Sequence, residues 1–266
     1  MTLVVSDVDG TLVDKEKKLT PGTVTAVERL RSASHSFTII SARPRSGMMP
    51  IAEALALDVP MGAFNGGTIF LRDGTVLSAE HLADDVVARV HALAAGTRVD
   101  TWVFAGDQWY ATDGDGPHTR SERITSNQEP VVPADLTTLE HVDKVTFVSD
   151  DEPLLRDLTS RLCARIARNE ATIVQSQSYY LDVTAPTANK GEGIARLAEA
   201  LGCTLVDTIA IGDQANDLAM FARAGRSIAM GQGPQAVRNA ADEVTLANDQ
   251  DGVAHAIDHL ILEPEA

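Results

Sequence analysis

The sequence predicts an α/β protein with a parallel central sheet, interrupted by an inserted α+β domain. Short, branched apolar runs, which suit strands buried on both faces, alternate with helical patterns over the first 80 residues. Several strands with only two helices follow, and the single strand–helix alternation then resumes. We therefore expect a core domain made of residues 1–80 and 185–266, and an inserted domain made of residues 81–184.

Composition limits the classes of function. The chain has 266 residues and a formal net charge of −16, so it lacks the basic surface that a nucleic-acid or anionic-membrane binder needs. No apolar run reaches the length of a membrane span, and the N-terminus is typical of a strand, not of a signal peptide. Cys163 and Cys203 fit no zinc or redox spacing. We expect a cytoplasmic protein that binds neither nucleic acid nor a membrane, in an oligomeric state that the sequence leaves open.

Local signals define the elements of the first core segment. Thr20 followed by Pro21 is typical of a helix start, because threonine caps the helix and proline suits its first position. Asn65 and Gly66 indicate a turn within an apolar run. The expected elements are a strand at 3–5, a helix from 21 to about 31, a strand at 37–40, a helix at 44–57, a broken strand at 60–70 and a strand at 76–77.

The inserted domain and the second core segment follow by the same reasoning. For the insertion we expect helices at 82–95 and 152–167, and strands at 99–104, 109–112, 144–148, 171–176 and 179–183, which form an antiparallel sheet covered on one face. For the returning core we expect helices at 191–201, 216–224 and 234–241, and strands at 208–211 and 227–230.

Two acidic residues follow the first strand, in the turn after it. Asp7 and Asp9 follow Leu3–Val5 directly and are followed by Gly10 and Thr11. In an extended chain both carboxylates lie on one side of the backbone, and such a pair is costly without a cation between them. Mg²⁺ is the expected cation, because it prefers a few carboxylates together with water and phosphate oxygens.

Three further stretches place polar residues at the same edge of the sheet. Ser41 ends the second strand, Lys190 opens a helix, and Asp213 with Asp217 follows the buried strand at 208–211. Taken singly, these residues are a helix cap, a surface lysine and an acidic helix start. The carboxyl ends of parallel strands share one edge, where ligands bind, so four stretches meeting there indicate a site.

These motifs resemble those of one enzyme family. The stretch Asp7–Leu12 is similar to the first motif of the haloacid dehalogenase-like (HAD) hydrolase superfamily, and Ser41–Pro44 to the second, with Ser41 and Ala42 where threonine and glycine are usual. Asn65–Gly66, Asn189–Gly191 and Gly212–Asp217 resemble the remaining motifs. The resemblance covers nearly the whole chain. It implies a Cof-type, subfamily IIB phosphatase with a Rossmann-like three-layer core and an inserted C2-type cap that sets substrate specificity.

The resemblance also implies roles for individual residues. Asp7 would be the nucleophile and Asp9 the general acid and base; Mg²⁺ would be bound by Asp7, Asp213 and the main-chain carbonyl of Asp9. Phosphate would be bound by Ser41, Ala42, Lys190 and Asn216. Thr11 and Asp217 would support these groups, and Arg43 and Asn65 would touch substrate. Trp102, Trp109 and Tyr180 are further candidates for substrate contact, but burial in the cap is the simpler interpretation of these three residues.

The implied activity is Mg²⁺-dependent hydrolysis of phosphomonoesters through an aspartyl-phosphate, with sugar phosphates or similar small metabolites as substrates. Two alternatives stay open from the residues. One is a phosphomutase, which would share Asp7 and Asp9 but return the phosphoryl group to the substrate. The other is a phosphosugar sensor without catalysis. The stretch Gly231–Ala236 fits a relaxed dinucleotide fingerprint but lies too close to the C-terminus for a following βαβ half.

Overall fold

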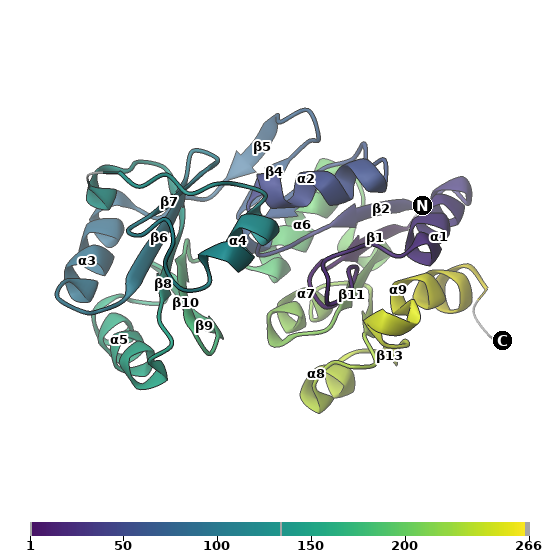
Figure 1. Ribbon diagram of the computed structural model, residues 1–266. Helices are drawn as coiled ribbons and strands as arrows, with labels where there is room; N and C mark the ends of the chain where they lie inside the picture. Colours follow the sequence, from purple (N-terminus) through teal and green to yellow (C-terminus); the bar gives the residue numbers. More distant parts are fainter. Residues whose placement is uncertain (1, 134, 264–266) are drawn as a thin grey trace. The chain divides into compact units, whose positions relative to one another are not determined.

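The computed structural model describes residues 2–133 and 135–263 (Figure 1). They divide into two compact units. The core unit takes in the described residues of 1–42, 48–78 and 189–266, and the inserted unit takes in those of 43–47 and 79–188. The roles predicted for the two domains, catalysis in one and substrate choice in the other, stay predictions.

The core unit is built on a parallel five-stranded sheet in the order β13-β12-β11-β1-β2. Strand β1, which lies between β11 and β2, is buried along its whole length, and its Leu3 lies opposite Thr208 on one neighbour and Ser36 on the other. The predicted α/β fold with a parallel sheet is confirmed. The strands are β1 (Leu3–Ser6), β2 (Ser36–Ile39), β11 (Thr208–Gly212), β12 (Arg226–Ala229) and β13 (Glu243–Val244).

Helices cover this sheet. Leu3 and Val5 of β1 pack in one apolar cluster with Ile194, Met220 and Val237, which come from three different helical segments. Helix α1 packs against β2 and α9, and its expected start is confirmed, since the Thr20 side chain accepts a hydrogen bond from the Thr23 N–H. The helices are α1 (Pro21–Ser32), α2 (Arg45–Ala54), α6 (Lys190–Ala200), α7 (Leu218–Phe221), α8 (Gln235–Ala240) and α9 (Gly252–His255), which continues as a π-helix (Ala256–Leu262).

A small sheet of three strands extends the core unit. Its order is β3-β4-β5, and β3 pairs antiparallel with β4. The strand expected at 60–70 breaks where predicted, because Asn65 adopts a left-handed conformation with φ of 58° inside a short 3₁₀ turn. The elements are β3 (Met61–Ala63), the turn Phe64–Gly66, β4 (Thr68–Phe70) and β5 (Val76–Ala79).

The inserted unit is an antiparallel sheet in the order β7-β6-β8-β10-β9. Helices α3 and α5 pack with alternate residues of the strands, such as Val103, Val145 and Leu181, and so cover one face (Figure 1). The elements are α3 (Asp84–Ala94), β6 (Asp100–Ala105), β7 (Gln108–Ala111), α4 (Thr119–Ser126), β8 (Val142–Val148), α5 (Glu152–Arg165), β9 (Thr172–Gln177) and β10 (Tyr180–Thr184).

Two elements escape the sequence patterns. Helix α4 buries Thr119, Glu122 and Ser126, while its Ile124 is exposed, so it has no apolar stripe to reveal it. Strand β13 has only two residues, which is too short for an alternating pattern. Among the described residues, no helix combines the length and the apolarity that crossing a bilayer would require.

Candidate active site

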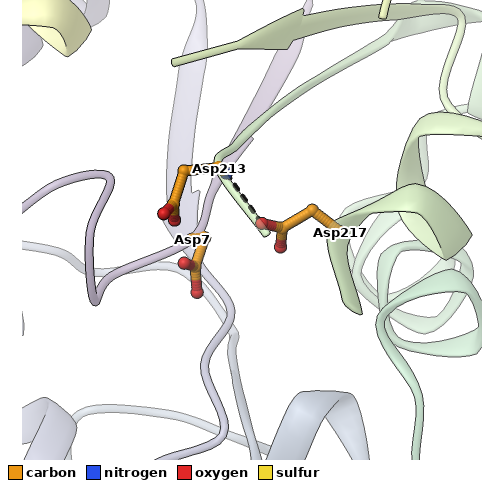
Figure 2. Close-up of side chains that lie close together, drawn as sticks. All are labelled: Asp7, Asp213 and Asp217. Atoms are coloured by element: carbon orange, nitrogen blue, oxygen red, sulfur yellow. Dashed lines mark hydrogen bonds between the residues drawn. The ribbon is translucent and has the colours of Figure 1, made fainter. Parts of the chain in front are cut away.

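Two adjacent strands of the core sheet bring two carboxylates together. Asp7 follows β1 and Asp213 follows β11, and the Asp7 N–H donates to the Ile211 carbonyl at 2.9 Å. Both side chains are buried, and Asp217 from the next turn joins them (Figure 2). One carboxylate oxygen of each residue lies within 4.8 Å of those of the other two. The carboxyl ends of β1 and β11 therefore form the acidic centre that the sequence predicts.

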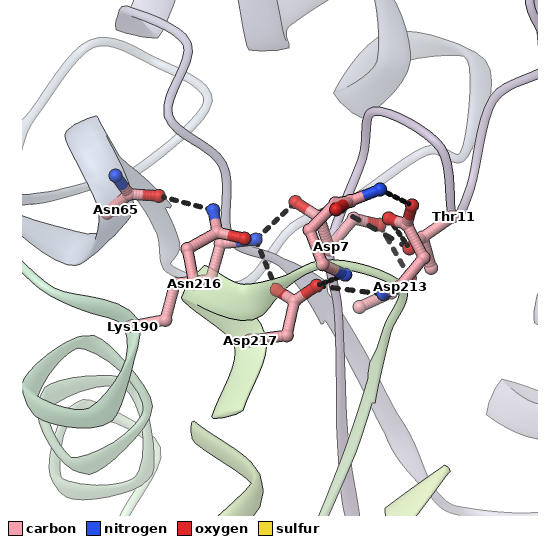
Figure 3. A network of polar contacts seen from close by, with 9 residues as sticks. Asp7, Thr11, Asn65, Lys190, Asp213, Asn216 and Asp217 are labelled. Carbon is pink, nitrogen blue, oxygen red and sulfur yellow. Dashed lines mark hydrogen bonds and ion pairs between the residues drawn. The ribbon is translucent and has the colours of Figure 1, made fainter. Parts of the chain in front are cut away.

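A buried lysine links the carboxylates. The Nζ of Lys190 donates to Asp7 Oδ1 at 2.5 Å and to Asp217 Oδ1 at 2.6 Å (Figure 3). Lys190 is the first residue of α6, and Asn189 caps this helix by accepting from the Glu192 N–H at 3.0 Å. The capped helix start thus fixes the position of the Lys190 backbone, from which the side chain extends to the carboxylates. What reads in sequence as an ordinary surface lysine is only 1% exposed.

The charges of the cluster do not balance. Burial raises the pKa of Asp7 to about 8, although Lys190 opposes this rise. Burial and the neighbouring Asp217 likewise raise the pKa of Asp213. Burial alone would lower the pKa of Lys190, but Asp217 and Asp7 together hold it above its ordinary value. Three carboxylates share one ammonium, so the cluster favours the binding of a further cation.

Asp217 is engaged by the protein itself. Its Oδ1 accepts from Lys190, and its Oδ2 accepts from the N–H groups of Asp213 and Gln214, both at 2.8 Å. These bonds close a tight 3₁₀ turn over Ala215–Asp217, so the helix expected at 216–224 is reduced to the short α7. A Cβ at Gly212 would lie 2.4 Å from the Asp217 carboxyl carbon, which explains the glycine there. This geometry supports the predicted role of Asp217 in orienting Lys190.

The turn after β1 is shaped around Asp213. The Thr11 hydroxyl donates to Asp213 Oδ1 at 3.0 Å and lies 3.5 Å from Asp7 Oδ2 (Figure 3). Gly10 has φ of +85°, and a Cβ there would lie 2.6 Å from Asp213 Oδ2. Both the conformation and the space therefore require glycine. Thr11 supports two carboxylates at once, in keeping with its predicted role.

Two asparagines lie beside this centre. The Asn216 side-chain amide donates to Asn65 Oδ1 at 3.4 Å (Figure 3). The Asn65 N–H donates to the Ser41 carbonyl at 2.7 Å, and the Ser41 N–H donates to the Gly62 carbonyl at 2.9 Å. Ser41 is buried, and Ala42 follows it in the core unit. Asn65 thus connects the predicted stretch at Ser41 with the predicted stretch that contains Asn216.

Not every predicted site residue lies in the cluster. The Asp9 carboxylate accepts from Lys17 Nζ at 2.7 Å, and it is not among the three grouped carboxylates of the described residues. Arg43 is buried and belongs to the inserted unit, where it donates to the Gly47 carbonyl at 3.0 Å. The ligand role of the Asp9 carbonyl and the substrate contact of Arg43 stay predictions.

Three aromatic residues of the inserted unit pack against one another. Trp102 and Trp109 are 1% and 0% exposed, and their rings meet edge to face at 5.2 Å. Tyr180 lies 5.2 Å from Trp102 in the same edge-on arrangement. Burial within the inserted unit, the simpler interpretation, is what the structure supports for the two tryptophans, while Tyr180 is half-buried beside them.

Two polar residues that the sequence reasoning missed hold the turn after β1. Gln232 Nε2 donates to the Gly10 carbonyl at 2.5 Å, and Asn248 Nδ2 donates to the Val13 carbonyl at 3.0 Å. The Asn248 N–H also donates to Gln232 Oε1 at 3.0 Å. The available signal was the pair of glycines around Gln232, since a Cβ at Gly233 would lie 2.8 Å from the Asp213 carbonyl.

Comparison with known proteins decides the family. The family model of the haloacid dehalogenase-like hydrolases matches residues 4–257. The chain belongs to this family. The predicted recognition and the predicted enzyme class, a hydrolase of this family, are confirmed.

Individual relatives extend over the whole chain. The HMP-PP phosphatase of Cronobacter sakazakii is 29% identical over 262 residues, which cover 97% of this chain and 95% of that protein. A haloacid dehalogenase-like hydrolase from Bacteroides thetaiotaomicron has a crystal structure with a TM-score of 0.89 and 28% identity, covering 97% of this chain and 99% of its own. The HAD subclass IIB sugar phosphatase BT4131 shares the fold, with a TM-score of 0.83, 22% identity and coverage of 98% and 99%.

Proposed function

We propose that this hydrolase is a Mg²⁺-dependent phosphomonoester phosphatase that acts through an aspartyl-phosphate on Asp7. One observation carries the proposal. A buried ammonium, Lys190, binds Asp7 and Asp217 at once while Asp213 lies beside them. A nucleophile, a positive charge for the phosphoryl group and a carboxylate for a metal therefore stand at one sheet edge.

The residues present fit Mg²⁺. Asp7 and Asp213 offer hard oxygen ligands, and the cluster carries two more carboxylates than ammonium groups, which a divalent cation would offset. Asp7, Asp213 and the main-chain carbonyl of Asp9 would hold the ion, whereas Asp217 is occupied by Lys190 and two main-chain N–H groups. When bound, Mg²⁺ screens Asp7 from the anionic phosphate and polarises the phosphoryl oxygens.

In the first step, an oxygen of Asp7 attacks phosphorus and the bond to the substrate oxygen breaks. Asp9 gives its proton to that oxygen, so the product leaves as an alcohol. Lys190, Asn216, the Ser41 hydroxyl and the Ala42 N–H would receive the charge that develops on the phosphoryl oxygens. Thr11 and Asp217 hold Asp213 and Lys190 in place.

In the second step, Asp9 takes a proton from a water molecule that attacks the same phosphorus. The bond to Asp7 breaks, inorganic phosphate leaves, and the Asp7 carboxylate and the protonated Asp9 are restored. The buried position of Asp7, only 5% exposed, limits the water that can reach the acyl phosphate.

We propose small phosphorylated metabolites as the substrates, with sugar phosphates as the first class to test. The net charge of −16 disfavours polyanionic macromolecules. One relative is named as an HMP-PP phosphatase. The inserted unit, with Arg43 and the core residue Asn65, would select among them. Two free thiols suit the cytoplasm as the place of action.

The test is release of inorganic phosphate from a panel of phosphorylated metabolites, with Mg²⁺ and with EDTA. We expect turnover that needs Mg²⁺ and is lost in Asp7→Asn. Asp207→Asn, which changes an exposed carboxylate bonded to Thr204, is the matched control and should keep full activity. A phosphoryl group that is returned to another position of the substrate, without release of phosphate, would indicate a mutase. Binding of the phosphorylated compound without any turnover would indicate a sensor. Either result would contradict the proposal.

A further inference from the structure

A lysine of the turn after β1 holds the predicted general acid. Lys17 Nζ lies 2.7 Å from Asp9 Oδ1, and the two side chains are 37% and 30% exposed. A half-exposed ion pair of this kind adds little to the stability of a fold. Its effect is therefore on the place and direction of the Asp9 carboxylate.

The loop at 14–18 is organised to present this lysine. Asp14 Oδ1 accepts from the N–H groups of Glu16 at 2.8 Å and Lys18 at 3.0 Å. The Asp14 N–H donates to the Lys18 carbonyl, and the Lys17 N–H donates to the Asp14 carbonyl, both at 3.0 Å. Four bonds thus close a small turn with Lys17 in it.

Lys17 has an unfavourable backbone conformation. Its φ is 63°, in the left-handed region that glycine and asparagine adopt far more readily than lysine. Such strain persists where the surrounding structure imposes it, and it concentrates at functional sites. A glycine would relax the turn but would remove the amine that reaches Asp9.

The other end of the segment is fixed as well. Gln232 binds the Gly10 carbonyl and Asn248 binds the Val13 carbonyl, so the chain between Asp9 and the loop is held from outside. The Asp9 carboxylate is not among the three carboxylates of the described residues that group together, those of Asp7, Asp213 and Asp217. A fourth carboxylate in that cluster would add repulsion and would compete for the metal.

We propose that Lys17 is a positioning residue: its ammonium keeps the Asp9 carboxylate outside the metal-binding cluster and directed to the leaving group. This inference rests on the proposed phosphatase function. When the metal site is saturated, loss of Lys17 should affect the protonation of the leaving oxygen, so the inference predicts a defect that depends on the leaving group.

The experiment compares two substrates of the Mg²⁺-loaded enzyme, an aryl phosphate and a sugar phosphate that the wild type hydrolyses. The parameter kcat/KM reports the steps up to formation of the phosphoenzyme. A phenolate leaves without a proton, whereas a sugar alcohol needs one. We expect Lys17→Met to lower kcat/KM about tenfold for the sugar phosphate and less than about threefold for the aryl phosphate, a part of what general acid catalysis contributes.

Matched variants separate this role from a structural one. Lys17→Arg keeps the charge and should restore most of the rate with the sugar phosphate. Lys17→Gly relaxes the turn and should fold at least as stably as the wild type, yet show the defect of Lys17→Met. Lys18→Met, which removes an amine bonded to Glu16 at 2.9 Å, should behave as the wild type. In an Asp9→Asn background, Lys17→Met should cause no further loss.

Three results would overturn the inference: equal losses for both substrates, which would assign Lys17 to phosphate binding; a further loss in the Asp9→Asn background; or wild-type rates for Lys17→Met. A second experiment measures the Mg²⁺ affinity of the wild type and of both lysine variants by calorimetry, without substrate. This affinity should change in Lys17→Met but not in Lys18→Met, and an unchanged affinity would contradict the exclusion of Asp9 from the cluster. A wild type that releases no phosphate would instead refute the proposed function itself.

Discussion

The carboxylate–lysine cluster of the core unit and the aromatic cluster of the inserted unit differ in how their buried polar groups are bonded. In the core unit, Lys190 and Asp217 are almost fully buried, and residues far apart in the chain satisfy their hydrogen bonds. In the inserted unit, the indole nitrogens of Trp102 and Trp109 and the hydroxyl of Thr119 are buried without a partner among the described residues. Unpaired buried groups cost free energy, whereas a fully bonded network fixes its members in one arrangement.

The difference shows in which region the fold holds polar side chains in fixed positions. The core cluster holds its side chains ready before any ligand binds, as catalysis by fixed charges requires. The inserted unit is held by apolar packing and edge-to-face aromatic contacts, which tolerate substitution of volume-matched residues more readily. Three substitutions or additions compare the two regions directly.

The largest effect is expected from removal of the buried ammonium. Lys190→Met leaves Asp7 and Asp217 buried without their cation, which should lower the free energy of unfolding by about 3–5 kcal/mol in the absence of Mg²⁺. The control is Lys144→Met in the inserted unit, whose amine lies 4.5 Å from the Phe104 ring centre. That change should cost less than about 1 kcal/mol. Urea unfolding measures both, and equal losses would contradict the comparison.

A smaller effect is expected from the metal. Mg²⁺ at a hundred times its dissociation constant should raise the free energy of unfolding by about 2.7 kcal/mol, because it binds the folded chain only. Asp213→Asn should abolish this gain. Asp182→Asn, which alters a carboxylate of the inserted unit bonded to Thr146 at 2.6 Å, should leave it intact. Thermal unfolding with and without Mg²⁺ measures the gain, and its survival in Asp213→Asn would refute the ligand assignment.

The smallest effect comes from a pair of isosteric changes. Thr11→Val removes a hydroxyl that donates to Asp213, and it should cost about 1–2 kcal/mol because the buried carboxylate loses one donor while Gln214 still donates to it. Thr119→Val removes a buried hydroxyl without a partner among the described residues, so stability should be unchanged or slightly higher. Denaturant midpoints of the two variants decide the point, and a greater loss in Thr119→Val would reverse the comparison.

Much of the core could be predicted from sequence because its signals are local. The apolar run Leu3–Val5 and the Thr20–Pro21 pair each determine a nearby element. Parallel pairing of β1 and β11 then brings Asp7 and Asp213 to one edge without further information.

The remainder depends on contacts between distant residues. The glycines beside Gln232 indicate a close approach of the backbone, but nothing near Gln232 or Asn248 identifies Gly10 and Val13, more than two hundred residues away, as their partners. The direction of the Asp9 side chain depends on a strained turn that no periodicity reveals. Helix α4 buries polar residues, so an apolar pattern could not find it.

The central claim is that Asp7 becomes phosphorylated. The most direct measurement is the mass of the Asp7 peptide from the Asp9→Asn variant, quenched in acid after mixing with Mg²⁺ and an aryl phosphate. The aryl group leaves without a proton, but the second step lacks its base, so the intermediate should accumulate. We predict that one phosphoryl group is found on Asp7. A phosphoryl group on another residue, or turnover with no label on Asp7, would contradict the mechanism.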